Sequence, residues 1–288
     1  IPFSYYNTFV IEEKFGFNKT TKKTFFLDII KSFIITIIIG SILLFPSIYL
    51  FETLESGFWI WLWAGVSALM IFINMFYTDL IVPIFNKLTP LDNGDLRKKI
   101  EGYSSKVGYL LKNIYVIDGS KRSTKANAFF SGLGPKKTIA LYDTLIEKHT
   151  DDELVAVLAH EVGHYKKKHI IFNIVASIIL TGITLFILSL FVNVPELSLA
   201  IGVNQPSFHA GLIAFGILYS PISEITGLIM NYFSRKFEYQ ADDFAKNTYA
   251  GEPLVTSLKK LSKNSLSNLT PHPAYVFVHY SHPTLLER

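Results

Sequence analysis

The hydrophobic residues of this chain gather into long uninterrupted blocks. Residues 32–51, 57–78 and 170–192 contain no charged side chain, and a fourth block, residues 210–230, is interrupted only by Glu224. A helix that crosses the hydrocarbon core of a bilayer needs about 20 largely apolar residues. The pattern therefore predicts four membrane-spanning helices, because three uncharged runs of this length are hard to place in the core of a soluble protein of 288 residues.

The charges between the blocks alternate in sign along the chain. The connectors 52–57 and 193–208 contain no Lys or Arg. The opposite ends of the predicted spans are flanked by lysines, which are Lys22, Lys23, Lys31, Lys87, Lys166, Lys167 and Lys168. Positive residues near span ends mark the cytoplasmic side. Residues 79–169 and the tail after the fourth span are therefore both expected on that side.

The remaining sequence predicts a compact polar unit in two pieces. Residues 96–111 are expected to form a helix and residues 113–117 a strand, and residues 126–130 and 138–142 are expected to form a hairpin. The hairpin's turn residues are Gly132, Gly134 and Pro135. A further helix is predicted at 231–249, beyond the last span.

These elements predict a mainly α polytopic membrane protein. We expect four divisions: 1–78 with an amphipathic segment and two spans, 79–169 with the first catalytic segment, 170–230 with two spans, and 231–288 with the second catalytic segment.

Composition removes several classes of function. The chain has no cysteine, which excludes disulfides and cysteine-ligated metals. Its formal net charge of +4 is accounted for largely by the lysines at the span ends, so no nucleic-acid partner is expected. The chain begins at Ile1 and has no signal-peptide pattern, and its apolar residues 1–10 predict that an N-terminal segment has been removed.

The strongest chemical signal is His160-Glu161-Val162-Gly163-His164, an H-E-x-x-H motif. Positions i and i+4 share one face of a helix, so both imidazoles can bind one metal ion while Glu161 acts as general base. The pattern Thr150-x-x-Glu153 predicts a capping box that begins this helix. The alternative is two ordinary histidines on a helix near a membrane boundary.

A catalytic zinc takes three protein ligands, so a third must lie elsewhere in the sequence. No third histidine follows at the metzincin spacing, which favours a carboxylate on a second helix. Glu238 and Asp242 lie one helical turn apart, and we expect Glu238 to bind the metal and Asp242 to accept a hydrogen bond from a ligand histidine. Without the H-E-x-x-H motif, Glu238 and Asp242 would be interpreted as part of an ordinary solvent-exposed charged helix face.

The chain resembles the type I CAAX prenyl endopeptidases, which are membrane zinc peptidases of the gluzincin type. The matching stretches follow the family order through nearly the whole chain. They are TFVIEEKFGFNKTT (8–21), PIFNKLTPL (83–91), GSKRSTKANAFFSG (119–132), LYDTLIE (141–147), HEVGH (160–164), NYFSRKFEYQAD (231–242) and HYSHPTLLER (279–288).

The resemblance implies a helical transmembrane chamber closed by a zincin-like α+β catalytic domain, and two further spans before Ile1. It implies one Zn²⁺ per chain with Glu238 as its third ligand. It also implies that His282, with Arg288 as a helper, stabilises the tetrahedral intermediate. The segment that contains Asn127 and Ala128 is expected to be an edge strand that pairs with substrate. The chain departs from many members in Pro283-Thr284 and in Lys125-Ala126, which affects specificity more than reaction class.

These observations predict an integral-membrane zinc metalloendopeptidase that cuts near the C-terminus of a peptide or protein substrate, whose prenylation stays open. The alternatives are a quality-control metalloprotease like HtpX and a channel or metal-binding protein without catalysis. The membrane would be the endoplasmic reticulum in a eukaryote and the inner membrane in a bacterium. Glu224 either has a functional part or lines a wet chamber wall.

Overall fold

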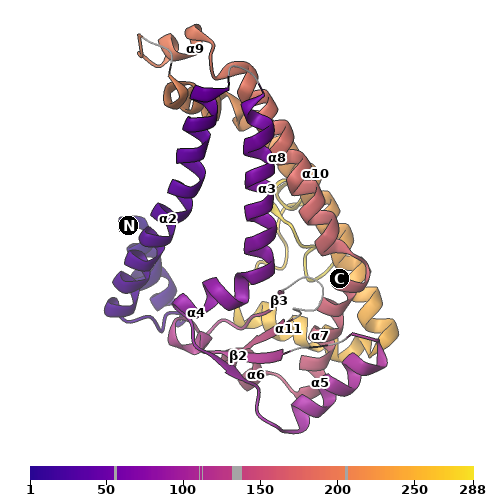
Figure 1. Cartoon of the computed structure of the whole chain (residues 1–288). Helices are drawn as coiled ribbons and strands as arrows, with labels where there is room; N and C mark the ends of the chain where they lie inside the picture. Colours follow the sequence, from indigo (N-terminus) through magenta and orange to yellow (C-terminus); the bar gives the residue numbers. More distant parts are fainter. Residues whose placement is uncertain (55–56, 110, 112, 132–137, 205–206) are drawn as a thin grey trace.

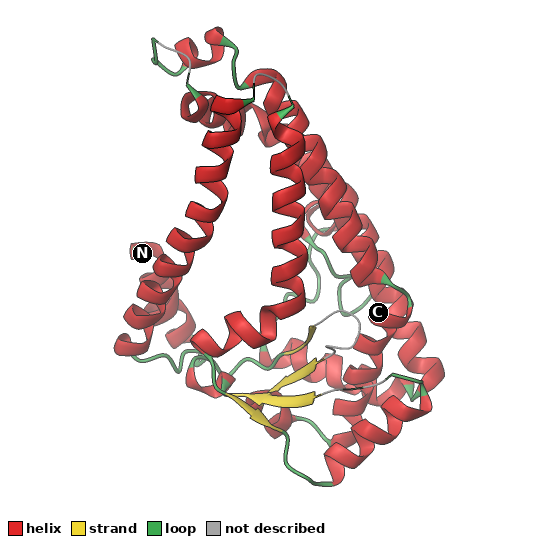
Figure 2. Ribbon diagram, viewed as in Figure 1, coloured by secondary structure: helices red, strands yellow, loops and turns green. Residues whose placement is uncertain are grey.

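A computed structural model describes residues 1–288 except 55–56, 110, 112, 132–137 and 205–206. The described chain is mainly helical, with long helices at one end and a small sheet surrounded by shorter helices at the other (Figures 1 and 2). This arrangement confirms the expected fold class.

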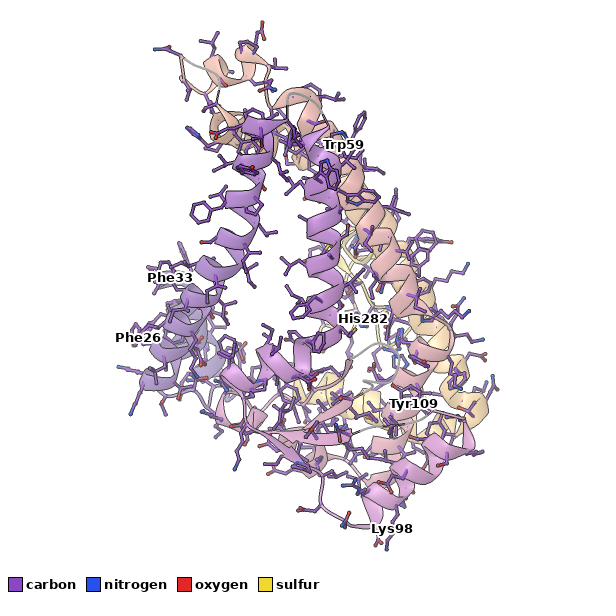
Figure 3. The ribbon with its side chains drawn as sticks, viewed as in Figure 1. Phe26, Phe33, Trp59, Lys98, Tyr109 and His282 are labelled. Atoms are coloured by element: carbon purple, nitrogen blue, oxygen red, sulfur yellow. The ribbon has the colours of Figure 1, made fainter. Side chains whose placement is uncertain are left out.

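Four helices are long and apolar enough to cross a membrane, which confirms the predicted number for the part of the chain that is described. They are α2 (Lys22–Thr53), α3 (Phe58–Phe76) with its continuation through η2 (Tyr77–Ile81) and α4 (Val82–Phe85), α8 (His169–Phe191) and α10 (Phe208–Thr248). α3 packs along α8, whereas α2 contacts α3 near the end of the bundle marked by Trp59 and diverges from it toward the other end (Figures 1 and 3). Most of the apolar side chains of α2 are exposed, as expected for a surface that faces lipid or other membrane helices.

The fourth span does not end where the sequence predicts. The separate helix expected at 231–249 is wrong, because α10 continues without a break from Phe208 to Thr248. Its 41 residues extend for about 60 Å at 1.5 Å per residue. Residues 222–248 contain no proline, and Pro221 is accommodated inside the helix, so nothing interrupts the hydrogen-bond ladder at residue 231. One rigid element therefore leads from the membrane into the catalytic unit.

Both polar segments lie at the same end of the bundle. The sheet, α7 (Asp151–Lys166) and the C-terminal half of α10 are at the bottom of the view in Figure 1, and α9 (Pro195–Ala200) is at the top. The sequence predicts that residues 79–169 and the tail after the fourth span lie on the same side of the membrane, and this arrangement agrees with that prediction.

The sheet has four strands in the order β1-β2-β4-β3. They are β1 (Leu88–Pro90), β2 (Asn113–Ile117), β3 (Ala128–Ser131) and β4 (Thr138–Tyr142). β2 and β4 are parallel, while β3 pairs antiparallel with β4 and forms an edge, with Ala128 opposite Leu141. The strand at 113–117 and the antiparallel pair are confirmed, although β3 begins two residues later than predicted; the turn residues Gly132, Gly134 and Pro135 lie outside the described residues.

One hydrophobic core joins the two polar segments. Leu154, Leu158 and Val162 of α7 pack in a single cluster with Ala245 of α10 and Leu254 of α11 (Gly251–Asn264). The cluster includes residues of α5 (Asp95–Lys106), which is shorter than the helix predicted at 96–111. The remaining described elements are α1 (Pro2–Tyr6), η1 (Asn7–Glu12), η3 (Gly119–Lys121), α6 (Asp143–Lys148) and α12 (Pro273–His279).

An ion pair ties the first span to the catalytic end. Arg122 donates from Nε and Nη2 to the two carboxylate oxygens of Asp28 at 2.8 and 2.9 Å, and also to the carbonyl of Phe85 at 2.7 Å. Such two-point contacts fix orientation as well as distance. The loop that leads into β3 is thereby held against the start of α2.

Candidate metal centre

The H-E-x-x-H motif lies in the third and fourth turns of α7, a helix whose start is fixed by a capping box. The hydroxyl of Thr150 accepts a hydrogen bond from the Glu153 N–H at 3.4 Å, and the Glu153 carboxylate accepts one from the Thr150 N–H at 2.8 Å. The predicted cap is therefore confirmed. Lys260 of α11 adds an ion pair to the buried Glu153 at 2.6 Å, which links the cap to the second polar segment.

The two catalytic helices approach each other closely at Gly163. A Cβ on this residue would lie 3.0 Å from Cα and 3.1 Å from the carbonyl oxygen of Ala241, closer than ordinary van der Waals contact at 3.4–4 Å. Ala241 is completely buried. Small residues on both helices allow the backbones to pack together, and this packing brings Glu238, one turn before Ala241, to the face of α7 that carries the histidines.

Three side chains converge at this contact. Nε2 of His160 lies 3.2 Å from Nε2 of His164 and 3.4 Å from Oε2 of Glu238, and Nε2 of His164 lies 3.3 Å from Oε1 of Glu238. Among the described residues, this is the cluster whose ligand atoms all fall within 4.8 Å of one another. Oε2 of Glu238 is buried and makes no hydrogen bond to any residue that the structure describes.

The donors fit a metal ion. Two imidazole nitrogens and a carboxylate are a typical ligand set for a catalytic divalent ion. Burial alone would lower the pKa of His160, but the adjacent carboxylates of Asp242 and Glu238 raise it to about 9, so the site stabilises positive charge. The sequence-predicted ligands are thus brought together in a place that favours a cation.

Glu161 lies between the two histidines in sequence and is partly buried. Burial raises the pKa of its carboxyl group, and this effect is opposed by the nearby His160 and His164. A carboxylate with a raised pKa is a stronger base, which suits proton transfer near neutral pH.

Asp242 and Arg288 form a second layer behind the ligands. Asp242 Oδ1 lies 2.8 Å from Nδ1 of His160, as expected from the sequence. Arg288 donates from Nε to Asp242 at 2.7 Å and from Nη2 to its other oxygen, and Nη1 lies 3.2 Å from Glu238 Oε2. The guanidinium of Arg288 is thus directed at carboxylates, and its side chain is only 9% exposed.

His282 reaches the cluster from the C-terminal tail. Its Nε2 lies 3.3 Å from Oε1 of Glu238, while its side chain is 63% exposed, so it borders the solvent-facing side. Figure 3 shows His282 where the spanning helices meet the catalytic unit. Its Nδ1 is 2.9 Å from the hydroxyl of Ser281.

The predicted substrate strand is an edge strand in the structure. Asn127 is exposed just before β3, and its side-chain oxygen accepts a hydrogen bond from the Ala128 N–H at 2.9 Å. Ala128 is partly buried against the core that contains α7.

Two residues near the metal ligands were missed by sequence reasoning. His169 Nδ1 lies 3.0 Å from His164 Nδ1, and His169 Nε2 lies 2.8 Å from Oε1 of Gln240. The sequence analysis gave neither residue a role. No sequence signal places His169 behind His164, because the two histidines are on different helices.

Comparison with known proteins gives consistent matches. Residues 90–288 match peptidase family M48, and residues 1–87 match the CAAX prenyl protease N-terminal family, described as five membrane helices. The whole chain is 39% identical to the CAAX prenyl protease 1 homolog of Oryza sativa subsp. japonica over 68% of that protein, and 36% identical to CAAX prenyl protease 1 of Saccharomyces cerevisiae over 67% of it. The crystal structure of S. mikatae Ste24p matches with a TM-score of 0.94 and 36% identity, over 99% of this chain and 70% of that one.

Four spanning helices joined to a unit with a His-His-Glu cluster and an adjacent glutamate define an integral-membrane metalloendopeptidase. The chain belongs to peptidase family M48, and it is similar throughout its length to the CAAX prenyl proteases. It spans between 61% and 68% of the length of the first three curated relatives.

Proposed function

We propose that this protein is a zinc metalloendopeptidase of the CAAX prenyl protease type, which cuts a peptide bond near the C-terminus of prenylated substrates. The observation that carries the proposal is the convergence of His160, His164 and Glu238 beside Glu161. The names of the relatives support the substrate class, since they are called CAAX prenyl proteases.

One Zn²⁺ per chain is the proposed metal. Ligands at about 2.0–2.1 Å from a tetrahedral zinc are separated by about 3.3–3.4 Å from one another. The distances among the ligand atoms of His160, His164 and Glu238, 3.2 to 3.4 Å, support this choice. Zinc, when bound, would polarise the scissile carbonyl and lower the pKa of a water molecule to about 7.

The protein's own residues then move the protons. Glu161 accepts a proton from the attacking water at its carboxylate and donates it to the leaving amide nitrogen. Its raised pKa supports both halves of this task, because the group must be a base first and an acid afterwards.

We assign the remaining site residues by what they contact. His282 donates from Nε2 to the developing oxyanion, since it is the exposed member of the cluster. Asp242 accepts a hydrogen bond from Nδ1 of His160, and this bond keeps the Nε2 lone pair of His160 directed at the metal position. Arg288 aids the reaction by holding Asp242 and Glu238 in place.

The substrate is proposed to bind as an added strand at the free edge of β3. An extended peptide can pair with an edge strand, so that main-chain hydrogen bonds place the scissile bond. Asn127 and Ala128 are the proposed substrate-contacting residues, because they lie at the start of that edge.

We propose that the catalytic segments lie in the cytoplasm, on the side marked by the lysines. The membrane would be that of the endoplasmic reticulum in a eukaryotic source and the inner membrane in a bacterial one. The proposed divisions are 1–78 and 170–230 for the spans and 79–169 and 231–288 for the catalytic unit, and α10 runs from the division 170–230 into the division 231–288.

The proposal is tested with the purified protein in liposomes, using a farnesylated CAAX peptide and its unprenylated twin. We expect preferential cutting of the farnesylated peptide, abolished by a chelator and restored by Zn²⁺. Glu161→Gln should retain one zinc per chain and lose turnover by about 10²–10⁴-fold. Glu252→Gln, which changes an exposed glutamate in the first turn of α11, is the control and should cut normally.

Each alternative has its own outcome in the same assay. Equal cutting of both peptides would reject prenyl recognition and favour a quality-control protease like HtpX. Full activity of Glu161→Gln, or cutting that resists chelation, would reject the zinc mechanism. Absence of cutting with zinc bound would favour a metal-binding or channel protein.

A further inference from the structure

The second metal ligand, His164, has both ring nitrogens engaged. Its Nε2 faces the ligand cluster, 3.2 Å from His160 Nε2 and 3.3 Å from Glu238 Oε1. Its Nδ1 lies 3.0 Å from Nδ1 of His169. Two facing ring nitrogens at this distance can share only one hydrogen, so one histidine donates and the other accepts.

The direction of that hydrogen bond decides whether His164 can bind a metal. A ligand imidazole offers a lone pair, so a His164 that binds through Nε2 must carry its proton on Nδ1. His169 Nδ1 must then accept, which leaves the His169 proton on Nε2. That atom lies 2.8 Å from Oε1 of Gln240, an acceptor, so the chain of bonds is consistent from end to end.

The reverse direction would disable the site. If His169 donated to His164, the His164 proton would lie on Nε2 and point at the other two ligands. The contact of His169 Nε2 with the acceptor Oε1 of Gln240 disfavours this arrangement, because a neutral imidazole has one N–H and this contact uses it.

Three helices hold the relay in position. His169 is the first residue of α8 and is 3% exposed, and its ring stacks on Phe237 of α10 with centroids 4.1 Å apart and planes at 9°. Lys168, with a φ of 63°, forms the left-handed turn that returns the chain from α7 toward His164. Phe237 and Gln240 flank the ligand Glu238 on one helix.

We propose that His169, oriented by Gln240, is a positioning residue that keeps His164 in the Nδ1–H form needed to bind the metal. His169 would orient His164 by a hydrogen bond to its Nδ1, as Asp242 orients His160. The inference rests on the proposed metal site and goes beyond it, because neither His169 nor Gln240 is one of the three proposed ligands.

Two substitutions at one position separate the hydrogen bond from packing. His169→Phe retains a flat ring that can stack on Phe237 and removes both nitrogens. His169→Asn loses the ring, but its amide oxygen can occupy the place of Nδ1 and accept from His164. Outer partners of metal ligands typically contribute about 10–100-fold to metal affinity. We expect His169→Phe to weaken Zn²⁺ binding by this factor and His169→Asn to remain within about threefold of the unchanged protein.

The measurements are Zn²⁺ affinity by competition with a chelator, the visible absorption spectrum of the Co²⁺-loaded protein, and the thermal stability of the metal-free protein. Gln240→Leu, at a partly exposed position, should weaken Zn²⁺ binding in the same direction as His169→Phe. His149→Phe is the matched control, since His149 is also a buried histidine of this unit but bonds to the Leu145 carbonyl. It should leave affinity and spectrum unchanged.

Unchanged Zn²⁺ affinity in His169→Phe would overturn the proposal. So would a loss of affinity in His169→Asn as large as in His169→Phe, because packing would then explain both. Failure of the proposed function would give a different result. The unchanged protein would then bind no Zn²⁺, or the variants His160→Ala and Glu238→Ala would bind Zn²⁺ as tightly as the unchanged protein.

Discussion

The close approach of α7 and α10 can be tested at a single atom by Gly163→Ala. The added Cβ would lie 3.0 Å from Cα and 3.1 Å from the carbonyl oxygen of Ala241, and 3.2 Å from Cβ of Phe244. Because the first two of these atoms are backbone, no change of side-chain rotamer can make room. The helices must separate by about 0.4 Å to restore the shortest ordinary contact of 3.4 Å.

Two opposing effects set the change in stability. Replacing glycine by alanine inside a helix stabilises it by about 0.8–1 kcal/mol. Overpacking a tight contact costs about 1–3 kcal/mol. We therefore expect a net destabilisation of about 1 kcal/mol. The effect on the metal should be larger, because ligand distances tolerate only about 0.2 Å and Glu238 is carried by the helix that moves.

We expect Gly163→Ala to lower Zn²⁺ affinity at least about tenfold, which corresponds to about 1.4 kcal/mol. The assay is chelator competition, together with unfolding of the catalytic unit by denaturant. Gly102→Ala on α5 is the control, because its Cβ would meet nothing within 4 Å and should stabilise the protein without affecting the metal. If Gly163→Ala behaved like Gly102→Ala in both measurements, the argument from helix proximity would be refuted.

Three further predictions concern stability. Glu153→Gln should lower the free energy of unfolding by about 1 kcal/mol at pH 7. Burial would raise the pKa of Glu153, but Lys260 and the Thr150 N–H lower it below its ordinary 4.5. In denaturant titrations at several pH values, the difference in the free energy of unfolding between the unchanged protein and Glu153→Gln should therefore shrink as the pH falls below 4.5. Lys168→Gly should be tolerated and Lys168→Val should cost about 1–2 kcal/mol by the same titration, because the φ of 63° disfavours a β-branched residue. Trp63→Phe removes the 2.8 Å hydrogen bond from the indole to the Ile178 carbonyl and should cost about 0.6 kcal/mol in a thermal unfolding scan, whereas no change would show that the bond contributes nothing.

The spans and the start of α7 were predictable because their signals are local. An uncharged run of sufficient length has few alternatives to a membrane helix, and Thr150 with Glu153 forms its hydrogen bonds within one turn. The continuity of α10 was missed for the opposite reason. The change from apolar to charged residues near residue 231 reflects the environment of the helix, and it carries no signal for a break in the backbone.

The candidate site was predictable to the extent that its residues share one helix face. His160 and His164 are neighbours by helical periodicity, and Glu238 and Asp242 repeat that spacing on α10. The position of His169 depends instead on the left-handed turn at Lys168 and on the packing of α8 against α10. Such long-range geometry has no counterpart in the spacing of the residues.

The charges around the ligands explain why this pocket suits a divalent ion. Glu161, Glu238 and Asp242 supply three carboxylates within the cluster, and Arg288 supplies one guanidinium, so these side chains carry a net charge of about −2 when ionised. Burial makes an unbalanced charge costly, and the rise in the pKa of His160 to about 9 is the response expected of a group in such a negative field. A bound divalent cation would neutralise the excess. Arg288 reduces the excess charge without reaching the two histidine Nε2 atoms, and so leaves the position between them for the metal.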